Sequence, residues 1–237
     1  SWCAKMIRGA MSWFFTTVGP ACLAASGPNG ISVGKIEWTR LITHSEYWNR
    51  HAEADFRLLN LLATRTPLSV ESQMRATSPA RLEELSRFPF IYAHDISSLS
   101  PAETRNLAEY VKRGGFLFVD FCGNVKINPA PTIFLARQVS ALKSHLPDLR
   151  VATLEPGHEV FSNFFKMTKF PPQTRPGDSA WLDGPTNPLR ALYAGDRMIG
   201  IVGLSGFQCA WGNVGSAENA VECMQMVANI YIYAMTH

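Results

Sequence analysis

The chain has 237 residues, of which 46% are hydrophobic and 17% are charged, and its formal net charge is +3. That length suits one α/β domain with a full-sized core plus a short terminal piece, and the composition excludes a wholly disordered chain. The small charge and the lack of a Lys or Arg run argue against a nucleic-acid partner.

The N-terminus has the pattern of a secretory signal peptide. Lys5 and Arg8 precede an apolar run over residues 10–25 that ends in small residues. A basic start, a short apolar centre and a small-residue end are typical of a cleaved signal, and the run is short for a membrane span. The alternative is a buried N-terminal helix. The expected organisation is a signal peptide at 1–25, a linker at 26–35 and one exported domain, periplasmic or secreted, at 36–237, with no membrane span in the mature chain.

Strands and helices alternate along the domain. Strands are expected at 31–41, 68–72, 88–94, 116–121 and 149–154, and helices at 55–66, 79–87, 131–146 and 217–237. Residues 190–205 are typical of two strands joined at Gly195-Asp196, a hairpin signal. Residues 156–189 are rich in Pro and Gly and predict a long excursion.

The segment 88–124 is the most informative part of the chain. FPFIYAH (88–94) and FLFVDF (116–121) are nearly continuous apolar runs, as in parallel strands covered on both faces. Between them, Ser100 and Glu103 predict a capping box, and Gly114-Gly115 predicts the end of the helix. The alternation indicates a three-layer α/β sandwich with a mostly parallel central sheet, of flavodoxin-like type.

Reactive side chains follow both of these strands. His94 and Asp95 follow the first, while Asp120 ends the second and Cys122 comes just after it. Ligands of parallel sheets bind outside the carboxyl ends of the strands, so this edge is the expected site. The chain has no GxGxxG, GxxxxGK[ST] or GxSxG motif, and we expect no cofactor.

Cys122 is a candidate nucleophile, because a strand-to-helix turn could expose it and lower its pKa. The small residues that such an elbow needs are replaced by Asp120 and Asn124, and a buried or incidental thiol is the alternative. His158 is a candidate general base, with Glu155 or Glu159 to orient it, or else a loop residue that anchors a turn.

Two further interpretations concern ligands. His94, Asp95, Asp120 and His158 could form a metal site, but no short ligand spacing supports it, and a polar cluster that orders the strand ends is the preferred interpretation. Trp48, Asn49 and Trp211 are expected in loops, where exposed aromatic groups suit stacking on a sugar or contact with a partner protein. The alternative is that they pack over the sheet edge.

An ordered set of motifs resembles a bacterial family catalogued as domain of unknown function 4159. The set covers about residues 36–236 and comprises YWN (47–49), PFIYAHD (89–95), LSPAE (99–103), GGFLFVDF (114–121), GHEVF (157–161), GDRMIGIV (195–202) and NIYIYAM (229–235). The resemblance implies a fold similar to class I glutamine amidotransferases, related to the trehalose-utilisation protein group. It also implies export or attachment to membrane-anchored proteins, and it assigns no activity.

The resemblance argues against an amidotransferase. Those enzymes use a Cys elbow and a His-x-Glu pair late in the chain. Here the elbow glycines are replaced, and the GHE sequence at 157–159 neither lies late in the chain nor has the His-x-Glu spacing. The family often has an acidic pair after the Gly-Gly strand and a proline after the histidine, where this chain has Asp120-Phe121 and His158-Glu159.

The sequence therefore predicts a non-catalytic ligand- or protein-binding module of the bacterial cell envelope, whose partner is an unknown ligand or envelope protein. A hydrolase acting on a carbohydrate or amide is the alternative. The expected ligand-binding residues are His94, Asp95, Asp120, Asn124, His158, Trp48, Asn49 and Trp211, and the catalytic candidates of the alternative are Cys122, His158 and Asp120.

Overall fold

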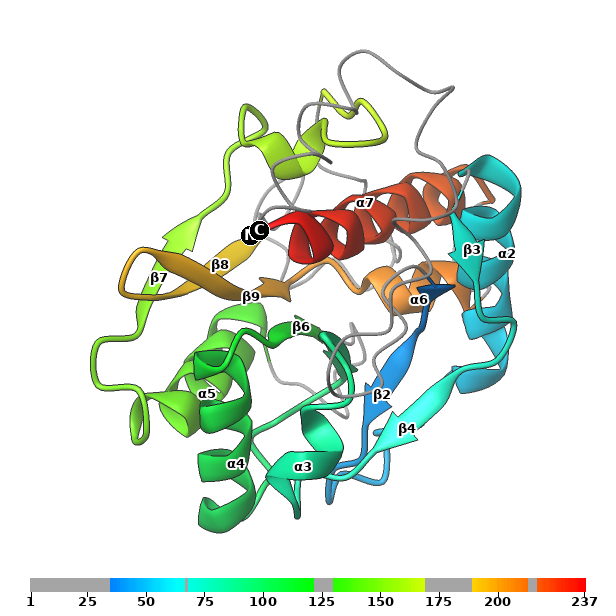
Figure 1. Ribbon diagram of the computed structural model, residues 1–237. Helices are drawn as coiled ribbons and strands as arrows, with labels where there is room; N and C mark the ends of the chain where they lie inside the picture. The colour runs from blue at the N-terminus through cyan, green and yellow to red at the C-terminus, as the bar shows by residue number, and fades with distance from the viewer. Residues whose placement is uncertain (1–34, 67, 122–129, 169–188, 213–216) are drawn as a thin grey trace.

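The computed structural model describes residues 35–66, 68–121, 130–168, 189–212 and 217–237. They form an α/β fold in which helices cover both faces of a mostly parallel sheet (Figure 1). The expected signal peptide at 1–25 and, apart from Lys35, the expected linker lie outside the described residues.

The larger sheet has seven strands in the order β4-β2-β5-β6-β9-β8-β7. The strands are β2 (Thr39–Leu41), β4 (Arg75–Thr77), β5 (Phe90–Ala93), β6 (Phe116–Asp120), β7 (Arg150–Thr153), β8 (Arg190–Ala194) and β9 (Arg197–Gly203). β4, β2, β5, β6 and β9 run parallel, and β8 is antiparallel to both of its neighbours. A second, two-stranded sheet pairs β1 (Lys35–Ile36) with β3 (Ser69–Val70).

The helices divide between the two faces of the larger sheet. α2 (Asp55–Arg65), α6 (Phe207–Trp211) and α7 (Ala217–Thr236) pack on one face, and α3 (Leu82–Leu85), α4 (Pro101–Lys112) and α5 (Pro131–Lys143) pack on the other. Two 3-10 helices, η1 (Ala52–Ala54) and η2 (Glu159–Phe161), complete the described elements.

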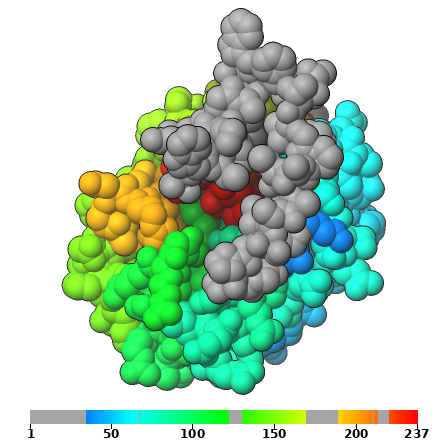
Figure 2. All heavy atoms as spheres, in the orientation of Figure 1, coloured from blue at the N-terminus to red at the C-terminus, as the bar shows by residue number. Residues whose placement is uncertain are grey.

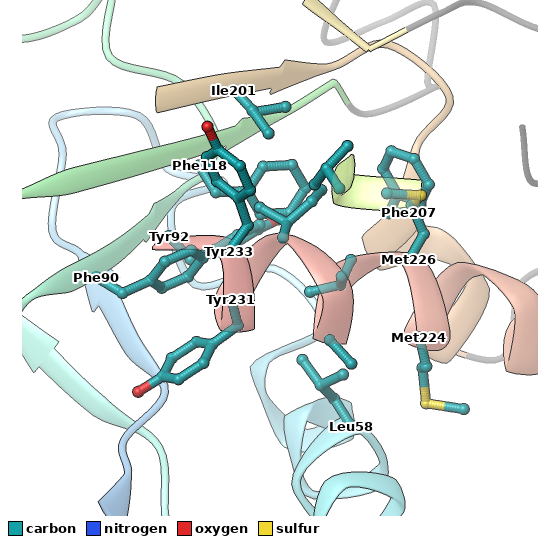
Figure 3. Close-up of a cluster of buried hydrophobic side chains, with 14 of the residues drawn as sticks. Leu58, Phe90, Tyr92, Phe118, Ile201, Phe207, Met224, Met226, Tyr231 and Tyr233 are labelled. Atoms are coloured by element: carbon teal, nitrogen blue, oxygen red, sulfur yellow. The ribbon is translucent and has the colours of Figure 1, made fainter. Parts of the chain in front are cut away.

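The central strands are buried on both sides, as their apolar sequences predict. Phe90 and Tyr92 point into the α2/α6/α7 layer, and Ile91 points into the α3/α4/α5 layer, because side chains alternate along a strand. Figure 3 shows Leu58 of α2 and Met226 of α7 in the same cluster of buried side chains as Phe90 and Tyr92 of β5 and Phe118 of β6. Figure 2 shows α7, in red, reaching the surface beside the orange stretch that contains the β8–β9 hairpin.

Local sequence signals predicted several element ends correctly. The Ser100 side chain accepts a hydrogen bond from the Glu103 N–H, and the Glu103 carboxylate accepts one from the Ser100 N–H, so the predicted capping box is confirmed. Gly195 forms the predicted β8–β9 turn with a φ of 59°, a conformation that costs glycine little. The structure adds elements that the sequence did not predict, namely β4, α6 and the 3-10 helices η1 and η2.

Candidate functional site

The carboxyl ends of β5 and β6 meet at one edge of the sheet. Ala93 pairs with Val119 in the parallel register, so His94 and Asp120 each follow this pair by one residue on neighbouring strands. Side-chain alternation places both on the face that carries Tyr92 and Phe118, which α6 covers. The structure thus brings His94, Asp95 and Asp120 to a single edge, and we call this the strand-end site.

Asp120 anchors the start of α6. Its side chain is 1% exposed, and its two carboxylate oxygens accept hydrogen bonds from the backbone N–H groups of Phe207 (3.1 Å) and Gln208 (2.7 Å). The neighbouring strand residue is Gly203, where a Cβ would come within 3.0 Å of the Asp120 carboxylate. Asp120 therefore holds a helix against the sheet from a buried position, which its sequence position alone did not indicate.

Asp95 ties the end of β5 to α5. One carboxylate oxygen accepts hydrogen bonds from the Ser97 N–H and hydroxyl and from the Gln138 side-chain amide, each at 2.8 Å. The Gln138 carbonyl in turn accepts a bond from the Ile96 N–H at 2.8 Å. The hydrogen bonds of this half-buried carboxylate order the turn after β5. This agrees with the preferred interpretation, a polar cluster that orders the strand ends.

His94 differs from both aspartates. The residue is 1% exposed, and neither ring nitrogen has a hydrogen-bond partner in the described part of the chain. A buried polar group left without a partner costs about 1–3 kcal/mol, so native structures contain few of them and each requires an explanation. Thr43 and Ser98, which follow β2 and β5, also have buried hydroxyl oxygens with no partner among the described residues.

A loop follows β2, and the Gln208 side-chain amide joins its Arg50 carbonyl to the start of α6. The loop is built from successive turns in which Trp48, Arg50 and Ala52 donate backbone hydrogen bonds to carbonyl groups three residues earlier. Trp48 is half-buried and Asn49 is exposed, so both are at the surface, as predicted.

The loop is held from beneath by Arg40, a buried cation on β2. One guanidinium nitrogen, Nη1, donates to the carbonyl groups of Trp48 (3.3 Å) and Arg50 (3.1 Å), and the charge is neutralised by Asp55 at the start of α2. This pair was not predicted from the sequence. The available signal was the alternation Ile36, Trp38, Arg40, which puts a charge at a position that faces the core and therefore requires a buried partner.

The prediction that Trp211 is an exposed loop residue is wrong. Trp211 is 0% exposed and is the last residue of α6, with its indole N–H donating to Asp55 at 3.0 Å. Its ring meets that of Trp38 edge-on, with centroids 6.1 Å apart. The indole has an apolar body and one N–H donor, so the buried carboxylate gives it a complete interior environment.

His158 does not join the strand-end site. Its ring lies 5.6 Å from that of Tyr233, and Tyr233 packs against Phe116 at the opposite end of β6 from Asp120. The His158 Nδ1 accepts the Val160 N–H and caps η2, so the alternative of a turn-anchoring residue describes it. Burial lowers the pKa of His158, Glu159 partly opposes this shift, and His237 adds to it, so that the net shift is downward. Glu159, a predicted orienting partner, pairs with His237 instead, at 2.9 Å.

Two predicted residues, Cys122 and Asn124, lie outside the described residues, and their roles stay predictions. Among the described cysteines, Cys223 of α7 is a poor nucleophile, because burial and the nearby Asp120 raise the pKa of its thiol. Within the described ranges, no three His, Cys, Asp or Glu side chains are placed to hold a metal ion.

No helix in the described part of the chain is both long and apolar enough to cross a membrane.

A small open cavity of about 350 Å³ lies away from the strand-end site. It is lined by Leu82, Glu83, Ser86, Arg87 and Arg113. Arg87 precedes β5 and Arg113 precedes β6, so this cavity is at the amino ends of the strands.

The comparisons with known proteins agree with the motifs seen in the sequence. The family model described as domain of unknown function (DUF4159) matches residues 37–235. A comparison with curated proteins finds no match. The family match spans nearly the whole domain expected at 36–237 and all the described elements from β2 to α7, so the chain belongs to the DUF4159 family.

Proposed function

We propose that this protein is a non-catalytic binding module whose ligand contacts the strand-end site at His94. The observation that carries the proposal is the buried imidazole with neither nitrogen bonded among the described residues, beside two aspartates whose carboxylates are bonded. In natural proteins, buried polar groups without a hydrogen-bond partner occur chiefly where function requires them.

The bonding of the two site carboxylates supports binding rather than catalysis. A general base needs a carboxylate or imidazole poised against the substrate. Asp120 is occupied by two backbone N–H groups of α6, and Asp95 by Ser97 and Gln138. Their removal would disturb α6 and the turn after β5 before it affected any chemistry.

Three finer features belong to the same proposal. The basic and apolar pattern of residues 1–25 supports export to the cell envelope, periplasmic or secreted. A mostly parallel sheet between two helical layers supports a class I glutamine amidotransferase-like fold. The half-buried Trp48 and exposed Asn49 on the loop above Arg40 support a recognition surface, either for a ligand or for an envelope protein.

The experiment is a thermal-shift screen of the full chain with sugars, amino-acid amides, nucleotides and divalent metals, repeated on His94→Phe. Phenylalanine fills the site of an unpartnered imidazole, so we expect the ligand-free midpoint to stay the same or rise. A ligand that raises the midpoint of the parent protein should have no effect on the variant. The matched control is His145→Phe, a half-buried histidine just after α5, which should keep the ligand response.

Two outcomes would contradict this proposal. An equal ligand response in the parent and in His94→Phe would place the site elsewhere. Turnover of a glycoside or amide that disappears in a folded Asp120→Ala variant would instead favour the hydrolase, the alternative that the sequence left open.

A further inference from the structure

Within the strand-end site, the group with unused hydrogen-bonding capacity is the His94 imidazole, neither of whose nitrogens has a partner among the described residues. The charged groups nearby are already engaged: Asp95 and Asp120 with N–H and O–H donors, and Glu103 with Ser100 and His44. A ligand therefore meets an imidazole whose two nitrogens are both available for hydrogen bonds.

The donors and acceptors of the imidazole further restrict the chemical class of the ligand. In its neutral form, an imidazole has one N–H donor and one bare nitrogen acceptor. A carboxylate or phosphate only accepts, so it would leave the acceptor nitrogen of His94 unbonded. An ammonium only donates, so it would leave the His94 N–H unbonded. A hydroxyl or a carboxamide both donates and accepts.

The neighbouring charges act against an anion in particular. Asp95 follows His94 in the chain, and Asp120 occupies the level position on the adjacent strand. Like charges at such separations repel strongly in a site closed to water. Arg40, a described cation on this face, is held by Asp55 and by two loop carbonyl groups.

We infer that the strand-end site binds a neutral ligand group that both donates and accepts hydrogen bonds, a hydroxyl or a carboxamide, through His94. This inference rests on the proposed function, because it names the chemical class of ligand for the same site. Saccharides and amino-acid amides are the two sources of such groups.

The test uses four compounds with the same four-carbon spacing and different end groups. They are 1,4-butanediol, succinamide, succinate and 1,4-diaminobutane, each titrated into the full chain. The readout is the pair of imidazole ¹⁵N resonances of His94, assigned by their loss in His94→Phe. We expect the diol or the diamide to shift these resonances in a saturable way, and the dianion and dication to leave them unchanged.

The four titrations distinguish hydroxyl ligands from carboxamide ligands, and together with the thermal-shift screen they show which proposal fails. A response to the diol alone identifies hydroxyl ligands, and a response to the diamide alone identifies carboxamides. A saturable shift caused by succinate or 1,4-diaminobutane would overturn the neutral class. If none of the four compounds acts while the thermal-shift screen still finds a His94-dependent ligand, the ligand class is wrong and the binding function stands. If the screen also finds none, both fail.

Discussion

Arg40 and Asp55 form an ion pair from which solvent is excluded. The guanidinium Nε and Nη2 donate to the two carboxylate oxygens at 2.6 and 2.7 Å, and both residues are 0% exposed. The pair joins β2 to α2, and it also receives the indole N–H of Trp211 and supports the loop that presents Trp48. The surface loop of the candidate site is thus attached to a charge pair in the core.

Removing one member of this pair should destabilise the protein strongly. Asp55→Ala leaves a buried guanidinium without its counter-charge, and we expect the free energy of unfolding to fall by about 3–5 kcal/mol. Urea denaturation followed by circular dichroism measures this. The double variant Arg40→Met with Asp55→Leu should recover part of the loss, because it leaves no buried charge, although the Trp211 indole N–H and the loop carbonyl groups lose their partners. A single variant within 1 kcal/mol of the parent would show that water reaches the pair.

The capping box at the start of α4 should make a modest, local contribution. Ser100→Ala removes the acceptor for the Glu103 N–H, and we expect a loss of about 1 kcal/mol in the free energy of unfolding. Ser140→Ala is the control, since Ser140 is an exposed residue within α5 and should change stability by less than about 0.5 kcal/mol. Equal effects in the two variants would contradict a capping role.

Gly200 permits β9 to lie close to β6. A Cβ at this position would come within 2.4 Å of the Leu117 backbone carbonyl oxygen, which cannot move without breaking the ladder. Gly200→Ala should therefore lower the midpoint of thermal unfolding sharply. Gly157→Ala is the matched control, because nothing lies within 4 Å of its Cβ position, and it should be neutral or slightly stabilising. A Gly200→Ala variant as stable as this control would contradict the close packing.

His158 should make stability depend on pH in the mildly acidic range. Burial lowers its pKa below the ordinary 6.5, so between the two values the unfolded chain binds more protons than the folded protein. The free energy of unfolding should therefore fall as the pH is lowered from about 6.5 through the folded pKa. Urea midpoints measured from pH 7.5 to 5 check this.

His158→Asn is the matching variant for that measurement. Asparagine keeps a side-chain acceptor at the start of η2 and removes the titrating group. The decline below pH 6.5 should become shallower in this variant. An unchanged pH profile would assign the decline to other groups.

The predictable part of the fold is the part governed by local patterns. Buried apolar runs, a capping box and a glycine turn specify β5, β6, α4 and the β8–β9 hairpin from nearby residues alone. β4 could not be found in this way, because Arg75–Thr77 is a three-residue edge strand with two exposed residues and no alternation. α6 is only five residues long and depends on Asp120, which is far away in the sequence, to satisfy its first N–H groups.

The location of the candidate site could be predicted from the sequence, but the residues that belong to it could be predicted only in part. Strand order at the carboxyl ends brings His94, Asp95 and Asp120 together, as expected for a parallel sheet. His158 and Trp211 were misplaced because the path of the chain after β7 and after β9 depends on packing against α7 and Asp55, which no local pattern records. The distinction between the bonded aspartates and the unbonded His94 also required the three-dimensional contacts.

The short helix α6 has a consequence for the order in which this protein can form. Its residues supply the partners of Asp120, of Asp55 and, through the Gln208 side-chain amide, of the Arg50 carbonyl, across sequence separations of 87, 156 and 158 residues. A nascent chain that has not yet exposed residues 207–211 cannot complete these interactions, although β2, β5 and β6 have already been synthesised. Such long separations are typical of slow folding. The domain therefore completes its polar core only after nearly all of it has left the ribosome, and a cut before α6 would leave a buried acid on β6 and another on α2 without these partners.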